Sequence, residues 1–475
     1  MRRRLPFRFL SRSFASGLFA ASAAVACVSL TGCPQPANQG PAANPDAASS
    51  QNPGGATTGG QAAGDPADAA KAASGKSEAE VAATASADDV SAARKLLDGL
   101  GAKAKYEPKV GGLLREVSIQ DGASLTADDI ALFGRLSDLE KLQIFNYREL
   151  NDEMAAKLAA LKKLSALALT NSVINDATVD LIVKSFPNLV ELDLSSNTNM
   201  SSGVLKQISQ LAKLQRLTLV QNQFNDIGSQ QLPKLANLRS LDLRGNMEAG
   251  DMTMEVVGAL PKLSALKHRS TAVTDFGLEK LCESKTLDSL LLQDFIITDQ
   301  SGAFLAKLPK LSQLEIFRCQ GFGSEGVLAL KGLGLTRLTL RDLPNVDDRA
   351  LEVLAELPKL RRLYLHELSS VGDSGLSNLA KSGSLELLDI WSVPQMTDAT
   401  VAVIAKLSGV KELSIRSTGI SDASIDLLLG MPQLQSLTLK ENGSVTEAGL
   451  KRLSERKWTK LDVGNAGGDA DAAGQ

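Results

Sequence analysis

The sequence predicts an α/β solenoid of about fourteen strand–helix coils, with a parallel sheet on the concave face and helices on the convex face. The first supporting observation is a leucine pattern that returns every 24 or 25 residues between residues 114 and 457. The second is that each copy holds an alternating apolar segment followed by a segment with helical spacing. The coils begin at Leu114, Leu139, Leu164, Leu189, Leu214, Leu238, Leu263, Leu287, Leu311, Leu335, Leu360, Leu385, Val410 and Leu434.

Each coil opens with a short strand, as residues 335–341 illustrate. Leu338 and Leu340 alternate with Thr339 and Arg341, which is the two-residue period of a strand with one buried face. Positions 3, 5 and 7 of the coil, counted from its first leucine, are therefore expected to face away from the core.

A helix is predicted in the second half of the coil. Leu351, Leu354 and Leu357 recur every third residue and form one apolar stripe. Asp347 stands at the position of a helix N-cap, where its carboxylate can accept a backbone hydrogen bond. Pro358 ends the segment because proline cannot continue a helix.

A single coil cannot fold alone, because its apolar side chains bury too little surface to offset the conformational entropy of about 25 ordered residues. Stacking supplies the missing burial. The strands of successive coils should then lie about 4.8 Å apart in one continuous sheet.

The repeated motif identifies a resemblance. The pattern LxxLxL, followed by residues 273–278 (VTDFGL) and by a segment such as residues 308–311 (LPKL), resembles the leucine-rich repeats of the ribonuclease-inhibitor-like and F-box-associated type. The resemblance spans roughly residues 100–463 and implies a horseshoe-shaped solenoid. The ninth position, usually Asn or Cys in that family, is Asn197, Asn222, Asn246, Asn442 or Cys319 in five coils only.

The N-terminal segment, residues 1–32, has the features of a bacterial lipoprotein signal peptide. Five arginines precede an apolar run from Phe14 to Leu30, and residues 30–33 (LTGC) resemble a lipobox. The resemblance implies that Cys33 carries lipid and anchors an exported protein to a membrane, on its periplasmic side or at the cell surface. An ordinary signal peptide and an uncleaved signal anchor are the alternatives.

Composition divides the remaining chain into four parts. Residues 33–86 are rich in Ala, Gly, Pro and Gln and predict a disordered tether. Residues 87–113 combine an amphipathic helix with a short strand and predict an N-terminal cap. The leucine-rich-repeat domain is expected over residues 114–463, followed by a polar disordered tail at residues 464–475.

Charge argues against a nucleic-acid partner. The full chain has a net charge of −3, and removal of the signal segment with its five arginines and no acidic residue changes this to −8. No basic block interleaved with aromatic residues offsets that balance. We expect a monomer that binds neither nucleic acid nor a small-molecule cofactor.

Several motifs that could suggest a cofactor or a metal have structural explanations. Residues 321–326 read GFGSEG, a dinucleotide-type glycine pattern, but they align with the ordinary loop and helix start of the other coils. Cys282 and Cys319 lie in different coils and are not expected to form a disulfide. No CxxC or HxxH spacing predicts a metal site.

The two histidines do not predict catalysis. His268 replaces a core leucine and is expected to be a buried, hydrogen-bonded neutral side chain. His366 faces the concave side, where we expect no nucleophile with an orienting carboxylate beside it. No GxSxG or HExxH motif is present, so the sequence predicts no enzyme activity.

The concave surface of the last six coils is the predicted binding site. Aromatic residues make up only 4% of the chain, yet three fall on outward strand positions of this region, together with several arginines. Trp, Tyr and Arg are the residue types that dominate binding hot spots. The partner-binding candidates are Phe317, Arg341, Arg362, Tyr364, His366, Trp391 and Arg416.

These observations predict a non-catalytic, lipid-anchored protein that binds a protein partner on its concave sheet, with a glycan as an alternative ligand. A structural spacer in the cell envelope is the second interpretation. An adaptor in protein turnover is the third, by analogy with F-box-linked relatives. No F-box-like segment precedes the repeats, and the export signal indicates a different compartment.

Overall fold

The computed structural model describes residues 85–108 and 112–464. The chain divides into residues 1–77 and 78–475, and all described residues belong to the second unit. The predicted signal peptide with Cys33, nearly all of the tether and residues 465–475 of the tail lie outside the described residues.

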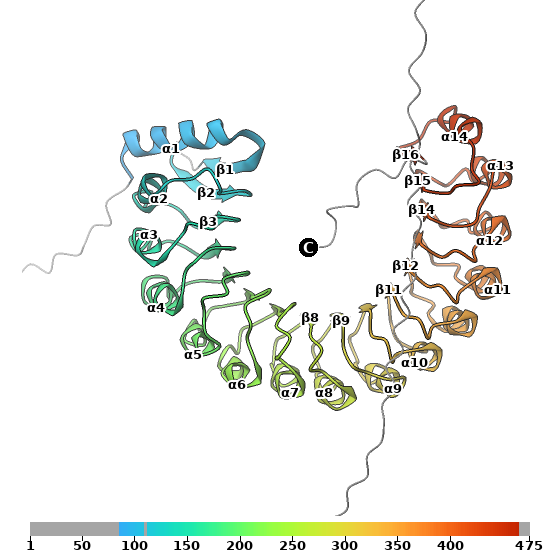
Figure 1. Cartoon of the computed structure of the whole chain (residues 1–475), viewed down its shortest axis with the longest axis horizontal. Helices are drawn as coiled ribbons and strands as arrows, with labels where there is room; N and C mark the ends of the chain where they lie inside the picture. The colour runs from blue at the N-terminus through green and yellow to red at the C-terminus, as the bar shows by residue number, and fades with distance from the viewer. Residues whose placement is uncertain (1–84, 109–111, 465–475) are drawn as a thin grey trace, which may run out of the picture. The chain divides into compact units, whose positions relative to one another are not determined.

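The described residues form one sheet of sixteen strands that follow one another in chain order. Strand β1 is antiparallel to β2, and every later neighbour is parallel. Within this unit the strands lie along the inner side of the curve and the helices along its outer side (Figure 1). The predicted fold class, a leucine-rich-repeat solenoid, is confirmed.

The strands are β1 (Ala104–Pro108), β2 (Leu114–Ile119), β3 (Lys141–Ile144), β4 (Ala166–Leu169), β5 (Glu191–Asp193), β6 (Arg216–Thr218), β7 (Ser240–Asp242), β8 (Ala265–Arg269), β9 (Ser289–Gln293), β10 (Gln313–Phe317), β11 (Arg337–Arg341), β12 (Arg362–His366), β13 (Leu387–Trp391), β14 (Glu412–Arg416), β15 (Ser436–Lys440) and β16 (Lys460–Gly464). The α-helices are α1 (Ala87–Leu100), α2 (Ala127–Gly134), α3 (Asp152–Ala156), α4 (Asp176–Ser185), α5 (Val204–Ile208), α6 (Asp226–Ser229), α7 (Asp251–Gly258), α8 (Asp275–Leu281), α9 (Gln300–Leu305), α10 (Ser324–Leu328), α11 (Asp373–Leu376), α12 (Asp398–Ile404), α13 (Ala423–Leu429) and α14 (Glu447–Ser454). The 3₁₀ segments are η1 (Gly101–Lys103), η2 (Leu232–Lys234), η3 (Asp348–Glu356) and η4 (Ser377–Lys381).

The strand pattern follows the predicted alternation. In β12, Leu363 and Leu365 are fully buried, whereas Arg362, Tyr364 and His366 are exposed or half-buried. This alternation fixes the register of the sheet, because a shift by one residue would expose the leucines. Residues 24 or 25 positions apart therefore lie side by side on adjacent strands.

Both ends of the apolar stack are covered. At the N-terminal end, helix α1 begins after the N-cap Ser86 and buries Val90, Ala93 and Leu97. At the C-terminal end, Trp458 packs partly buried against the core and donates its indole N–H to the Leu453 carbonyl at 2.7 Å.

The segment predicted as a helix in the coil that starts at Leu335 is a 3₁₀-helix, η3. Leu351, Leu354 and Leu357 are all buried. A spacing of three matches the 3.0 residues per turn of a 3₁₀-helix better than the 3.6 of an α-helix. The same spacing occurs at Val401, Ile404 and Leu407, where α12 is an α-helix, so the spacing alone does not distinguish the two helix types.

Aspartates at the helix starts connect neighbouring coils, which differs from the predicted role within one coil. Asp347 is the N-cap and accepts a hydrogen bond from the Arg349 N–H at 3.0 Å, as expected. Asp348, however, accepts one from the Gly372 N–H of the next coil at 2.7 Å. A carboxylate in the first helical turn thus satisfies an otherwise unpaired amide of its neighbour.

Candidate functional site

The residues predicted to bind a partner lie together on the concave face. Phe317 of β10 is opposite Arg341 of β11, and Arg341 is opposite His366 of β12. His366 in turn is opposite Trp391 of β13, which is opposite Arg416 of β14. Five strands at about 4.8 Å spacing give a stripe about 20 Å long.

We call the seven predicted residues together the concave array. The array consists of Phe317, Arg341, Arg362, Tyr364, His366, Trp391 and Arg416. Arg362 is exposed and the other six are half-buried.

The half-burial of the array comes from contacts between guanidinium groups and aromatic rings. The Arg341 guanidinium carbon lies 4.3 Å from the Phe317 ring centroid and 5.2 Å from that of Trp391. The Arg416 guanidinium carbon also lies 5.3 Å from the ring centroid of Trp391. Each contact is within the range in which a cation is attracted to a ring face. Arg341 therefore reaches across the strand of His366 to hold two rings in place.

His366 lies between two aromatic rings. Its ring centroid is 6.0 Å from that of Tyr364 and 5.8 Å from that of Trp391, both in edge-to-face geometry. Such contacts restrict the rotamers of all three side chains. The middle of the array is consequently ordered before any partner arrives.

The carboxylate of Asp389 lies beside His366. The His366 Nε2 atom is 3.5 Å from the Asp389 carboxylate, and Arg416 is also 3.5 Å from it. Burial raises the pKa of Asp389, but hydrogen bonding and charge from His366, with the charge of Arg416, lower that pKa below its ordinary value overall. Asp389 is therefore a half-buried carboxylate whose polar neighbours are the His366 imidazole and the Arg416 guanidinium.

This cluster does not have the arrangement of a hydrolase triad. The third polar neighbour of Asp389 is Ser414, whose hydroxyl also helps to lower the carboxyl pKa. The carboxylate thus lies between the imidazole and the hydroxyl, whereas in a triad the imidazole lies between the other two. The geometry supports charge balance and not nucleophile activation.

A pair of arginines lies at the start of the array strands, Arg362 within the array and Arg337 next to it. Arg337 and Arg362 are directly opposite each other on β11 and β12. The Arg337 guanidinium stacks over Tyr364 at 4.7 Å from the ring centroid. Among the residues that the structure describes, neither arginine forms an ion pair. These two cations remain available for acidic groups of a partner.

A shallow cavity of about 350 Å³ adjoins the array toward the last strands. Tyr364, Asp389 and Arg416 form part of its wall, and Lys440 and Asp462 lie on its other side. The array therefore borders a hollow lined by charges of both signs.

The sequence interpretation missed a larger hollow in the N-terminal half. A cavity of about 1240 Å³ opens above the strands of the first eight coils, and its lining includes Phe145, Asn171, Asp193, Ser195 and Arg244. The signal that could have revealed it is the small polar side chains at and just after these strands, such as Ser195 and Thr218, which line the cavity.

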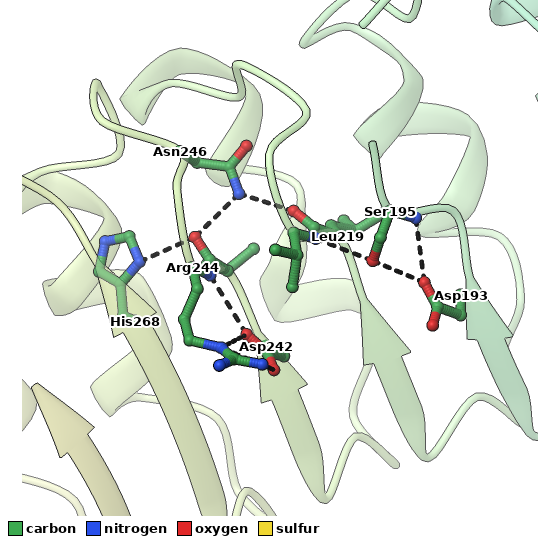
Figure 2. Close-up of polar contacts among 9 residues, drawn as sticks. Asp193, Ser195, Leu219, Asp242, Arg244, Asn246 and His268 are labelled. Atoms are coloured by element: carbon green, nitrogen blue, oxygen red, sulfur yellow. Dashed lines mark hydrogen bonds and ion pairs between the residues drawn. The ribbon is translucent and has the colours of Figure 1, made fainter. Parts of the chain in front are cut away.

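Hydrogen bonds between neighbours hold the polar wall of this cavity (Figure 2). Asp193 accepts hydrogen bonds from the backbone and the hydroxyl of Ser195 at 2.9 and 2.6 Å. Arg244 forms an ion pair with Asp242 at 3.0 Å. Burial raises the pKa of Asp193, although the bonds from Ser195 oppose the shift.

Behind the wall, a ladder of buried amides connects successive coils. Asn246 donates to the Leu219 and Leu243 carbonyls at 2.7 and 2.8 Å (Figure 2). His268 stands at the end of this ladder, with its ring nitrogens 3.1 Å from the Leu243 oxygen and 2.8 Å from the Ala249 oxygen. It is fully buried, and burial lowers its pKa, as expected for a structural neutral histidine.

The glycine pattern at residues 321–326 has a structural role. Asp299 of the preceding coil accepts hydrogen bonds from the Gly323 and Gly326 N–H groups at 2.6 and 2.9 Å. A carboxylate of the chain therefore occupies the place that a phosphate would need. Cys282 and Cys319 are free and buried, and burial raises the pKa of each thiol to about 12.

None of the helices in the described part of the chain is both long and apolar enough to cross a bilayer. Three or more side chains suited to a metal ion do not come together anywhere within residues 85–108 and 112–464.

Comparisons with known proteins add little beyond the fold. No family model matches the chain. A Caenorhabditis elegans protein with the provisional name RNA-binding protein EEED8.10 is 28% identical over 145 residues, which is 29% of this chain. The chain spans about a fifth of that relative's length, since the match covers 20% of it.

Solved structures of other repeat proteins resemble the chain at low identity. An internalin (inlF) of Listeria monocytogenes matches 74% of this chain and 95% of its own at 19% identity, with a TM-score of 0.42. Rad7 in its yeast complex with Elc1 matches 76% of this chain and 90% of its own at 17% identity, with a TM-score of 0.42. The TLR13 chain of a TLR13–ssRNA13 complex matches 72% of this chain and 45% of its own at 17% identity, with a TM-score of 0.38. The assignment of the architecture rests on this chain's own repeat.

Proposed function

We propose that this protein is a non-catalytic, lipid-anchored binding protein of the bacterial envelope, and that the concave array receives a protein partner. The observation that carries the proposal is the gathering of Phe317, Tyr364 and Trp391, with stacked arginines, on one outward face. Large rings and guanidinium groups supply most of the affinity in many protein interfaces.

The array is suited to binding because its side chains are already ordered. Side chains that must be immobilised on association cost about 0.5–1.5 kcal/mol each. Arg341 and His366 restrict the neighbouring rings in the free protein, so this cost is largely met during folding. A partner would then contact a rigid surface of rings and cations.

The partner is expected to present acidic groups. Arg337 and Arg362 form no ion pair within the described residues, and both lie at the start of the array strands. Arginine binds carboxylates in a two-pronged geometry that favours specific recognition. An acidic protein segment fits this edge better than a neutral glycan does.

Membrane attachment through Cys33 is part of the proposal, and it is supported by the sequence of residues 1–33 alone. The test is replacement of Cys33 by Ala in cells supplied with labelled fatty acid. The unmodified protein should incorporate the label, while C33A should be unlabelled and released in soluble form. Label retained on C33A would contradict the assignment.

The test of the array compares matched aromatic substitutions. Tyr364→Ala with Trp391→Ala should abolish crosslinking to the partner in intact cells. Phe145→Ala is the control, since Phe145 occupies the same position of its coil as Trp391 but lies in the N-terminal half. A partner list unchanged by Y364A/W391A, or altered equally by F145A, would remove the array from the proposal.

A structural spacer is the second candidate, and one observation favours it. Arg341 pairs with Glu367 at 3.0 Å, and Asp389 lies 3.5 Å from both His366 and Arg416, so most charges of the array are balanced without a partner. If the array serves only to stiffen the sheet, Y364A/W391A should lower stability and leave every crosslinked partner in place.

A further inference from the structure

Exposed large apolar side chains are rare in the described residues, and they cluster in one part of the solenoid. Ile227, Met252, Phe276 and Ile296 are 80%, 52%, 58% and 62% exposed, and Val173 at 46% completes the set. All five belong to coils three to eight, and none belongs to the concave array. Large apolar side chains that are exposed in one region of a surface commonly mark an interaction site.

Three of these residues occupy the same position in consecutive coils. Ile227, Met252 and Phe276 each directly follow an aspartate in the first turn of α6, α7 and α8. In the other eleven coils the equivalent residue is small, polar or charged. The core does not need a large apolar side chain there, since eleven coils fold without one.

Hydrogen bonds between the coils hold this row rigidly. Asp226 accepts from the N–H groups of Gly250 and Thr253, on either side of Met252, at 2.8 and 2.9 Å. Asp251 accepts from the N–H groups of Thr274 and Gly277, on either side of Phe276, at 2.7 and 3.1 Å.

The fourth residue continues the row into the next coil. Ile296 donates its N–H to the Val273 carbonyl at 2.9 Å and forms a β-bridge with Thr274, two residues from Phe276. We call Ile227, Met252, Phe276 and Ile296 the apolar row. It is a preorganised surface at the edge where the helices begin.

Acidic residues border the apolar row. Glu255 and Glu279 are exposed and lie one helical turn after Met252 and Phe276, a spacing at which side chains are neighbours. Glu248 is exposed and bridges to Asn225 beside Ile227. Lys280 is the nearby cation, and it pairs with Glu283 at 3.2 Å.

We propose that the apolar row is a docking site for a protein segment that carries large apolar side chains flanked by Lys or Arg. The apolar side chains would cover Met252 and Phe276, and the cations would meet Glu248, Glu255 and Glu279. A second copy of this chain fits poorly, because it would bring the same carboxylates against each other. The proposal is independent of the function assigned to the concave array.

The test uses the purified full chain and two synthetic peptides with identical leucine spacing, one carrying Lys and the other Glu at every charged position. Fluorescence anisotropy should detect binding of the Lys peptide and none of the Glu peptide. Met252→Gln with Phe276→Gln should weaken Lys-peptide binding by at least about tenfold, the effect expected for loss of a hot spot.

The matched control is Ala399→Gln with Ala423→Gln, exposed residues at the equivalent position of α12 and α13, which should leave binding unchanged. Glu255→Lys with Glu279→Lys should transfer binding to the Glu peptide. If M252Q/F276Q lowers the unfolding midpoint, M252Q alone replaces it.

Four results would overturn the proposal. They are failure of the Lys peptide to bind the unmodified chain, equal binding by M252Q/F276Q, equal binding of both peptides, and self-association in sedimentation that M252Q/F276Q abolishes. The last result would make a second copy the occupant of the row.

Discussion

The buried amide ladder allows a stability prediction that can be worked out atom by atom at Asn222. Its side-chain oxygen accepts from the Asn197 N–H at 2.9 Å, and its amide donates to the Leu194 carbonyl at 2.7 Å. Replacing Asn222 by Ala leaves the Asn197 N–H buried without an acceptor. The Leu194 carbonyl keeps a second donor, the Asn197 side chain, at 2.9 Å.

The expected loss follows from these two different outcomes. An orphaned buried donor costs about 1–3 kcal/mol, and a lost but replaceable hydrogen bond costs about 0.5–1.5 kcal/mol. Asn222→Ala should therefore lower the free energy of unfolding by about 2–4 kcal/mol. The assay is guanidinium-induced unfolding followed by circular dichroism, with midpoints compared because long repeat arrays can depart from two-state behaviour.

The control is Asn199→Ala, whose exposed amide donates one hydrogen bond of 3.3 Å to the Val173 carbonyl. Surface substitutions of this kind usually change stability by less than about 0.5 kcal/mol. If N222A and N199A unfold at the same denaturant concentration, the ladder does not hold the coils together and the reasoning is wrong.

Three further predictions concern the array, the thiols and the links between coils. The pKa of Asp389 is lowered in the fold, so its charge contributes stability above about pH 4 that is lost as the pH falls through the native pKa. Asp389→Asn should therefore flatten the decline of the unfolding temperature between pH 5 and 3. An unchanged slope would contradict the assigned charge balance. Cys282 and Cys319 are buried with thiol pKa values of about 12, so a maleimide should label them only after unfolding. Rapid labelling of either of these two residues in the native chain would disprove its burial. Asp299→Ala should lower the free energy of unfolding by about 1–3 kcal/mol, because the Gly323 and Gly326 N–H groups lose their acceptor. A399Q serves as a control, and an unaltered unfolding midpoint of D299A would refute the inter-coil role.

The period of the sequence was enough to predict the fold and the alignment of strand residues. The spacing between Trp391 and Arg416 equals one coil, and the structure places them opposite each other. This succeeds because a repeat makes long-range neighbours predictable from sequence distance alone. The outward alternation of strand residues followed from the same reasoning.

Contacts that depend on side-chain reach could not be predicted in this way. Arg341 crosses the strand of His366 to contact Trp391, and Asp389 approaches His366 diagonally. Both contacts depend on rotamers, which the period does not specify. The pairing of Asp348 with the next coil was missed because capping rules consider one helix at a time.

The N-terminal cavity and the apolar row were missed for different reasons. The cavity is lined by small polar side chains such as Ser195 and Thr218, whereas the prediction from the sequence relied on large rings. The row of Ile227, Met252 and Phe276 was visible as a column in the aligned coils. Its exposure, however, required knowing how far each helix start is covered by its neighbours.

The most direct measurement for the central claim is photo-crosslinking in living cells from a benzoylphenylalanine placed at Tyr364, with Phe145 as a concave-face comparison position in the N-terminal half. The account predicts one discrete adduct from position 364 that disappears when Trp391→Ala is added, and no such adduct from position 145. The absence of an adduct at 364, or the same adduct from both positions, would contradict the claim that the concave array binds a partner.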